Sequence, residues 1–104
     1  MRRIRILSAA VDEAAQATAW YENERSGLGA EFEAAVDAAL DILTLDPIPS
    51  VPVQGKAAKL GARRVILKRF PFDVVFIADA TLISVIAFSH HSRQPGYWHR
   101  RLRT

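Results

Sequence analysis

The sequence predicts a single α+β domain in which the elements follow the order β-α-α-β-β-β. Between residues 9 and 46 lie two stretches rich in helix-forming residues, with apolar side chains at three- and four-residue spacing. A short alternating segment precedes them, and three segments rich in β-branched and aromatic residues follow from residue 63 onward. The chain has 104 residues, of which 50% are hydrophobic, so residues 1–104 are enough for one domain and one core.

The first expected element is a strand over residues 3–7, where polar and apolar residues alternate. A helix over residues 9–24 should follow, because this stretch contains neither Gly nor Pro. Ser8 is placed to cap it, which would put Asp12 and Glu13 in its first turn, near the positive end of the helix dipole. The residues expected on its core-facing side are Val11, Ala14, Ala17, Trp20 and Tyr21.

A second helix should begin near Gly27 and Gly29 and end at Asp46, because the residue before Pro47 avoids the helical region. Its apolar residues, spaced four, four, four and three apart, are Leu28, Phe32, Val36, Leu40 and Leu43. Two helices with a short glycine link form an αα-hairpin. Residues 47–62, rich in Pro and Gly, are expected to form a loop.

Three strands are expected at residues 63–70, 72–78 and 82–89. The middle one is almost continuously apolar, which is typical of a central strand covered on both faces. The links between them are too short for parallel crossovers, so the pairing should be antiparallel.

Charge divides the chain into two parts. Residues 1–46 carry four arginines against nine carboxylates, whereas residues 47–104 carry ten Lys or Arg against two carboxylates. This asymmetry indicates either a basic face that meets nucleic acid or an acidic protein, or an acidic helical layer beside a basic sheet, each simply solvated. The lack of cysteine excludes disulfides, thiolate zinc sites and a cysteine nucleophile. No apolar run is long enough to span a membrane, and we expect a cytoplasmic protein without membrane partners.

All three histidines lie in the last fifteen residues, directly after the last strand. His90 and His91 should point to opposite sides, so only one can face a cleft. The histidine spacing matches no ordinary metal-ligand pair, and we expect no metal. His91 is either a general base or an exposed strand-end histidine.

Other residues of this segment also have two interpretations. Arg93 could bind a phosphate or a partner's carboxylate, or it could pair with Asp73 or Asp79. Tyr97 and Trp98 could stack on bases. Alternatively, a turn at residues 95–96 folds them back as anchors for the tail.

Several motifs together resemble a known family. They are Trp20-Tyr21-Glu22, Gly27-Leu28-Gly29, Arg69-Phe70-Pro71-Phe72 and Arg93-Gln94-Pro95-Gly96-Tyr97-Trp98. Their order and the chain length resemble the RelE/ParE superfamily of toxins from type II toxin–antitoxin modules, often described as plasmid-stabilisation proteins. The resemblance implies a curved antiparallel sheet packed on the αα-hairpin, with a short basic C-terminal tail. It also implies a cognate antitoxin, a hetero-oligomer with it, and no cofactor.

The family has two main branches. RelE-like members cleave mRNA on the ribosome without a metal, and ParE-like members inhibit DNA gyrase. Asp73 stands where RelE-like enzymes carry an arginine, and only Arg64 matches their paired lysines, with Ile66 at the other position. A carboxylate there would repel the scissile phosphate. The resemblance therefore favours a ParE-like gyrase inhibitor that is not an enzyme.

Two alternatives stay open. One is a RelE-like endoribonuclease using His91, Arg93 and Tyr97, and the other is a degenerate toxin that only binds its antitoxin. The side chains expected to contact a target or the antitoxin are Arg64, Lys68, Arg69, Arg93, Tyr97, Trp98, Arg100 and Arg101.

Overall fold

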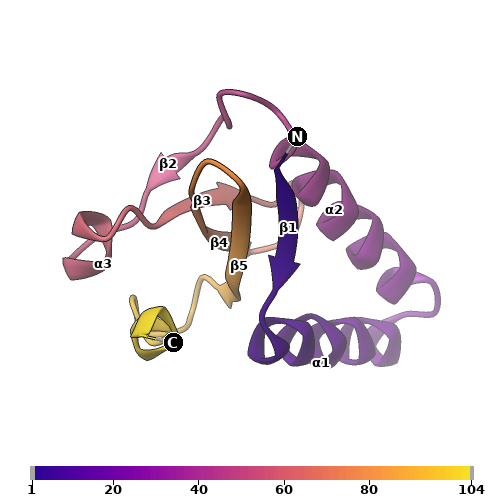
Figure 1. Ribbon diagram of the computed structural model, residues 1–104. Helices are drawn as coiled ribbons and strands as arrows, with labels where there is room; N and C mark the ends of the chain where they lie inside the picture. Colours follow the sequence, from indigo (N-terminus) through magenta and orange to yellow (C-terminus); the bar gives the residue numbers. More distant parts are fainter. Residues whose placement is uncertain (1, 104) are drawn as a thin grey trace.

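The structure is a computed structural model that describes residues 2–103. Two helices, a five-stranded sheet and two short helical segments make up the domain (Figure 1). The elements are β1 (Arg3–Ile6), α1 (Ser8–Glu24), α2 (Leu28–Ile42), β2 (Val51–Pro52), α3 (Lys56–Lys59), β3 (Arg63–Ile66), β4 (Phe72–Ala78), β5 (Leu82–His90) and the 3-10 helix η1 (His99–Arg103). The predicted α+β order is confirmed, with β2, α3 and η1 in addition.

The sheet is mixed, which corrects the expectation of a purely antiparallel sheet. Its strand order is β1-β5-β4-β3-β2. Strands β2 to β5 pair antiparallel, as their short links require, but β1 runs parallel to β5 with Ile4 beside Ile83 and Ile6 beside Val85. Residues 7–81 connect β1 to β5, so no short link restricts the direction of this pair.

The αα-hairpin covers one face of the sheet. In Figure 1, α1 and α2 form a V that opens toward the strands. The helices meet closely at Gly29, where a Cβ would lie 2.9 Å from the Thr18 carbonyl oxygen, so a larger residue would push them apart. The Glu22 carboxylate accepts hydrogen bonds from the N–H groups of Gly27 and Gly29, at 3.1 and 3.0 Å, and so satisfies free donors at the start of α2.

The start of α1 differs from the expectation. Ser8 is its first helical residue instead of its cap, and Leu7 occupies the cap position without a side-chain hydrogen bond. Asp12 and Glu13 consequently lie beyond the first turn. Val11 and Trp20, expected in the core, are 49% and 59% exposed, because the smaller alanines of α1 face the sheet and α2 instead.

Aromatic side chains fill the core between the hairpin and the sheet. Phe32 of α2 is fully buried, and its ring centroid lies 5.2 Å from that of Phe70 and 5.1 Å from that of Phe72. Tyr21 of α1 joins the same cluster. The predicted apolar spacing of α2 is thus confirmed at its centre.

The opposite face of the sheet has a smaller second core. Residues 47–62, predicted as loop, contribute β2 and α3, and the C-terminal segment folds back over the same face. Val53 and Ala57 from the first segment and Trp98 from the second are buried against Val75 of β4. This confirms the prediction that Trp98 anchors the tail.

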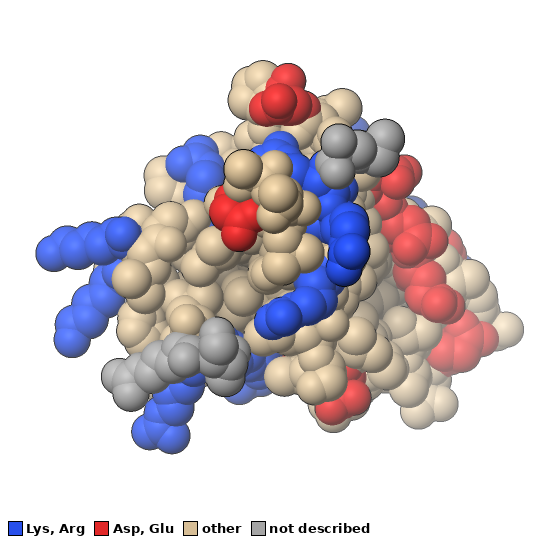
Figure 2. All heavy atoms as spheres, in the orientation of Figure 1, with Lys and Arg blue, Asp and Glu red and all other residues tan. Residues whose placement is uncertain are grey.

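Charges separate over the surface as the sequence indicates. Figure 2 shows carboxylates gathered over α2, and lysines and arginines over β1 and around α3 and the C-terminal segment. Within residues 2–103, no helix is long and apolar enough to cross a membrane.

Candidate functional site

A pocket of about 230 Å³ opens on the face of the sheet opposite the hairpin. Strands β3, β4 and β5 form its floor, and the segments that carry Val53 and Trp98 form its sides. Its charged and ionisable lining comes from Arg64, Asp73, His90, His91 and Arg93. It is therefore a predominantly basic pocket built around one carboxylate.

Asp73 is the buried centre of this pocket, with only 6% of the residue exposed. Arg64 Nη1 donates to Asp73 Oδ2 at 3.0 Å, and His91 Nε2 lies 2.8 Å from Asp73 Oδ1. The sheet register places these groups together: Ile66 lies opposite Asp73, so Arg64, two residues earlier on β3, reaches it diagonally on the same face.

The contacts of Asp73 with Arg64 and His91 determine the role that this carboxylate can have in the pocket. The guanidinium of Arg64 balances its charge, and its two oxygens are engaged by Arg64 and His91. A carboxylate bound to one imidazole nitrogen fixes the orientation of the ring and leaves the other nitrogen for proton transfer. The Asp73–His91 pair can therefore present Nδ1 of His91 as an acid or base in a basic pocket.

Glu13 of α1 fixes the C-terminal segment to the rest of the domain. Its Oε1 accepts from Arg101 Nη1 at 2.9 Å and from the Phe88 N–H at 3.1 Å. Its Oε2 accepts from Arg101 Nη2 at 3.1 Å and from the Tyr97 hydroxyl. Arg101 Nη1 also donates to the Ile86 carbonyl at 3.0 Å. One carboxylate thus ties α1, β5 and the tail together.

This environment keeps the Tyr97 hydroxyl protonated. Burial first, and then its hydrogen bond to Glu13, raises the pKa of Tyr97 to about 12. The hydrogen bond with Glu13 likewise raises the pKa of Arg101. The guanidinium carbon of Arg93 lies 3.8 Å from the centre of the Tyr97 ring, so Tyr97 supports Arg93 by a cation–π contact.

The predicted site residues do not form one cluster. Arg64, His91, Arg93 and Trp98 line the pocket, whereas Tyr97 meets Glu13 at its side. The interpretation of Tyr97 and Trp98 as anchors is confirmed by these contacts. The partners suggested for Arg93 are engaged elsewhere: Asp73 with Arg64 and His91, and Asp79 with the backbone of residues 81–82 in the β4–β5 turn.

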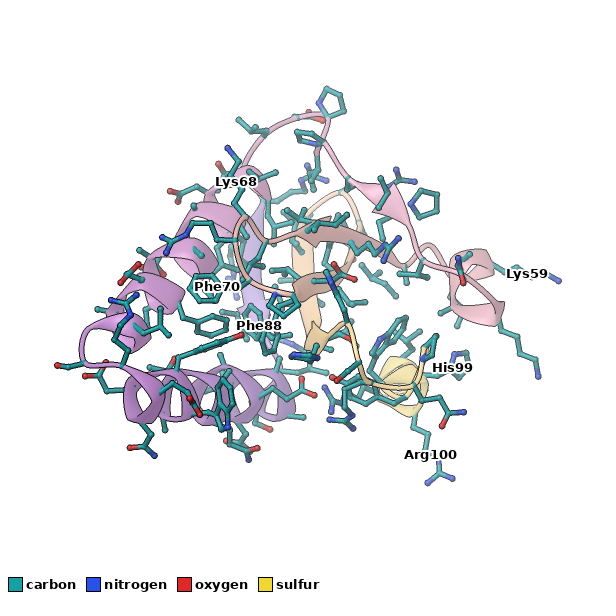
Figure 3. The ribbon with its side chains drawn as sticks, turned by 180° about the vertical axis from the view of Figure 1, so that it is seen from behind. Lys59, Lys68, Phe70, Phe88, His99 and Arg100 are labelled. Carbon is teal, nitrogen blue, oxygen red and sulfur yellow. The ribbon has the colours of Figure 1, made fainter. Side chains whose placement is uncertain are left out.

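Four other predicted binding residues do not line the pocket. Arg69, with a φ of 72°, forms an ion pair of 2.7 Å with Glu31 of α2. Lys68 is exposed on the same side, near α2, and Arg100 points away from η1 into solvent (Figure 3). Arg101 is partly buried against Glu13.

Sequence reasoning missed Glu13 as a site residue. Its bonding partners are 75 to 88 positions later in the chain, so no local pattern could have indicated them. The pairing of Arg64 with Asp73 had a weak signal, since two opposite charges nine residues apart flank a predicted turn. Among residues 2–103, no group of three His, Cys, Asp or Glu side chains is arranged to hold a metal.

A comparison of the chain with known proteins identifies a solved structure of similar fold. No protein-family model matches the sequence, and no curated protein matches it. A solved structure described as "Chromosomal ParDE TA system from P. aeruginosa" contains a chain that superposes with a TM-score of 0.66 at 14% sequence identity. The match covers 86% of this chain and 96% of that chain. The chain therefore shares the fold of that chain of the ParDE system.

Proposed function

We propose that this chain is the toxin of a type II toxin–antitoxin module, that a cognate antitoxin neutralises it, and that it stops growth by acting on DNA gyrase. The observation that carries the proposal is the likeness to a chain of the ParDE toxin–antitoxin system, which extends over nearly the whole length of both chains. The motifs that resemble the RelE/ParE superfamily support it independently. A basic face opposite an acidic helical layer suits a partner that folds onto it.

The arrangement of the pocket supports gyrase over RNA as the target. Two of the groups that a basic phosphate-cleaving site would use are engaged, because Glu13 binds both the Tyr97 hydroxyl and the Arg101 guanidinium. Arg64 is likewise engaged, because its guanidinium forms an ion pair with the buried Asp73 carboxylate.

A supercoiling assay tests this target. Purified protein added to DNA gyrase should block supercoiling or increase cleaved DNA. Glu33→Gln, an exposed change on α2, should act like the unchanged protein. No effect at micromolar excess, together with mRNA cleavage in a translation extract, would overturn gyrase as the target.

A second candidate, a ribosome-dependent endoribonuclease, is favoured by one observation. His91 lies 2.8 Å from Asp73, and Arg64 and Arg93 flank the pair in the pocket. His91 would take the proton from a ribose 2′-hydroxyl as that oxygen attacks the adjacent phosphorus. The bond to the 5′-oxygen of the next nucleotide would break, leaving a cyclic phosphate, and the arginines would stabilise the charge.

A translation extract programmed with a defined mRNA tests this candidate. Cleavage should fall by about 10²-fold or more in His91→Ala if His91 is the base. The matched control is His99→Ala, which removes a histidine that does not line the pocket. Equal cleavage by both variants would exclude His91 as the base.

A further inference from the structure

The pocket over β3, β4 and β5 has more hydrogen-bond donors than acceptors among its charged side chains. The carboxylate of its lining, Asp73, has both oxygens engaged by Arg64 and His91. Arg64 Nε is buried and donates to no group of residues 2–103. The Arg93 guanidinium forms no ion pair with a carboxylate in the same part of the chain. A pocket with donors in excess suits a ligand that brings acceptors.

Arg93 is held in a position from which it can bind an anion. Its guanidinium carbon lies 3.8 Å from the centre of the Tyr97 ring, and Tyr97 is itself fixed by its hydrogen bond to Glu13. The ring covers one face of the planar guanidinium and leaves the N–H groups at its edge, where a carboxylate can accept two parallel hydrogen bonds. Because the side chain is already ordered on the ring, binding an anion costs less conformational entropy than at a mobile arginine.

The charges of the lining favour an anion with a single negative charge. Arg64 and Arg93 contribute two positive charges and Asp73 one negative charge, so the lining has a net charge of +1 when the histidines are counted as neutral. A monoanion brings this total to zero. A dianion such as inorganic phosphate would leave an uncompensated negative charge beside the buried Asp73. The pocket therefore favours a monoanion over a dianion.

The rest of the lining is largely apolar and includes one well-exposed side chain. Val53, Val75 and Trp98 line the pocket from the second core. Ile66 lies opposite Asp73 in the sheet register, lines the same pocket and is 52% exposed. An apolar group resting on Ile66 would remove this surface from water. The pocket thus has room for a compact apolar body next to its cationic part.

A phosphodiester of a nucleic acid fits this combination less well. It also carries a single charge and would satisfy Arg93, but its neighbouring ribose groups would bring polar hydroxyls against Val53 and Ile66. The two aromatic rings are poorly placed for base stacking, since Trp98 is only 4% exposed and Arg93 lies on the Tyr97 ring. A carboxylate attached directly to an apolar body matches both parts of the lining.

We propose that this pocket binds a small organic monocarboxylate. The carboxylate lies on the Arg93 guanidinium, and the apolar body lies against Ile66 and Val53. This site goes beyond the function proposed above, because it needs neither an antitoxin nor gyrase, and purified chain alone is enough to test it.

Titration of the complete chain with four small molecules, followed by NMR shifts of the backbone amides, tests the ligand class. Benzoate should bind with a dissociation constant of about 1 mM or tighter and shift the amides of His91, Arg93 and Gly96. Benzamide, which has the same ring and no charge, should bind about tenfold more weakly or worse. The same loss is expected for dimethyl phosphate, a monoanion without a ring, and for inorganic phosphate at mildly alkaline pH, a dianion.

Each comparison has a result that overturns the proposal. Benzamide binding as tightly as benzoate would mean that the apolar lining alone holds the ring. Dimethyl phosphate binding as tightly would show that a single charge is enough and would point to a phosphodiester. Inorganic phosphate binding more tightly would contradict the charge balance. No binding of benzoate at about 10 mM, or shifts only outside the pocket, would exclude the site.

Arg93→Gln tests the anion-binding side chain. It should weaken benzoate binding by about tenfold or more and leave benzamide binding unchanged, since Gln removes the charge and keeps a polar side chain. The matched control is Arg100→Gln, which removes the same charge from an exposed arginine that points away from η1 (Figure 3). Equal weakening by both variants would mean that the overall charge of the protein attracts benzoate, and the assignment of the pocket would fail.

Asp73→Asn tests the charge balance. This change raises the net charge of the lining from +1 to +2, so inorganic phosphate should gain about tenfold in affinity and benzoate about threefold or less. An equal gain for both anions, or none for phosphate in a folded variant, would contradict the charge balance. Circular dichroism melts show whether each variant folds. If Asp73→Asn does not, the comparison of benzoate with inorganic phosphate on the unchanged chain decides.

Discussion

The two faces of the sheet are covered by different kinds of interaction. Beneath the hairpin, Phe32, Phe70 and Phe72 form an apolar core with ring centroids near 5 Å apart. On the other face, short segments cover a smaller core and leave a pocket around the buried carboxylate of Asp73. The first face supplies the stability of the fold, whereas the second keeps polar groups in fixed positions, which is what binding or chemistry requires.

The largest expected effect lies on the hairpin face. Phe32→Ala should destabilise the protein by about 3–5 kcal/mol, because it leaves a cavity in the centre of the aromatic cluster. Urea unfolding followed by circular dichroism measures the change, with exposed Glu33→Ala as the neighbouring control. A loss below about 1 kcal/mol would mean that the second face contributes much more of the stability than the packing indicates.

A smaller and more local effect is expected at Glu13. Glu13→Ala should cost about 1–3 kcal/mol, because it removes the carboxylate to which both the partly buried Arg101 guanidinium and the Tyr97 hydroxyl donate. The Trp20→Phe background makes Trp98 the single tryptophan, and its emission should then shift to longer wavelength as the tail loosens. Asp12→Ala serves as the control. An unchanged Trp98 signal would show that the tail is held by Trp98 packing alone.

Asp73→Asn tests the polar centre of the pocket. Asn keeps the size of the side chain but removes the charge that Arg64 and His91 share, and we expect a loss of about 1–2 kcal/mol. Thermal unfolding measures it. A variant that is more stable than the unchanged protein would indicate that Asp73 destabilises the fold and serves the activity instead.

The smallest effect expected is a pH dependence from Tyr97. The pKa of Tyr97 is raised from its ordinary 10 to about 12, so the folded state holds the proton more tightly than the unfolded state. Its contribution to stability is present in full below pH 10 and is lost as the pH rises from 10 to about 12. Stability over this range should fall more steeply in the unchanged protein than in Tyr97→Phe, as measured by urea unfolding at each pH. Parallel curves would place Tyr97 outside the influence of burial and Glu13.

Local patterns predicted the hairpin face well. The helical spacing around Phe32 and Val36 marks the buried side of α2, and the continuous apolar run of β4 gives its observed bounds, Phe72–Ala78. The parallel position of β1 could not be predicted, because strand order between the two ends of a chain depends on long-range packing.

The pocket face was less predictable for the same reason. The sequence alone suggested that the charge of Asp73 would repel a phosphate. It could not show the neutralising partner, Arg64, because Arg64 becomes a neighbour only through the register of β3 on β4. The sequence predicted Glu13 in the first turn of a helix, and only the structure shows that the C-terminal segment contacts it. Motif resemblance indicated the fold, but the separation of Arg69 and Lys68 from the pocket required the structure.

The most direct test of the central claim is growth after induction of three versions of the chain in bacteria without the antitoxin. They are the unchanged chain, a pocket variant with His91→Ala and Arg93→Glu, and a hairpin-surface control with Glu33→Gln and Asp37→Asn, all checked for equal thermal stability. We expect arrest by the unchanged chain and the control, and growth with the pocket variant. Growth with all three versions, or growth only with the hairpin-surface variant, would contradict a toxin that acts through the pocket face.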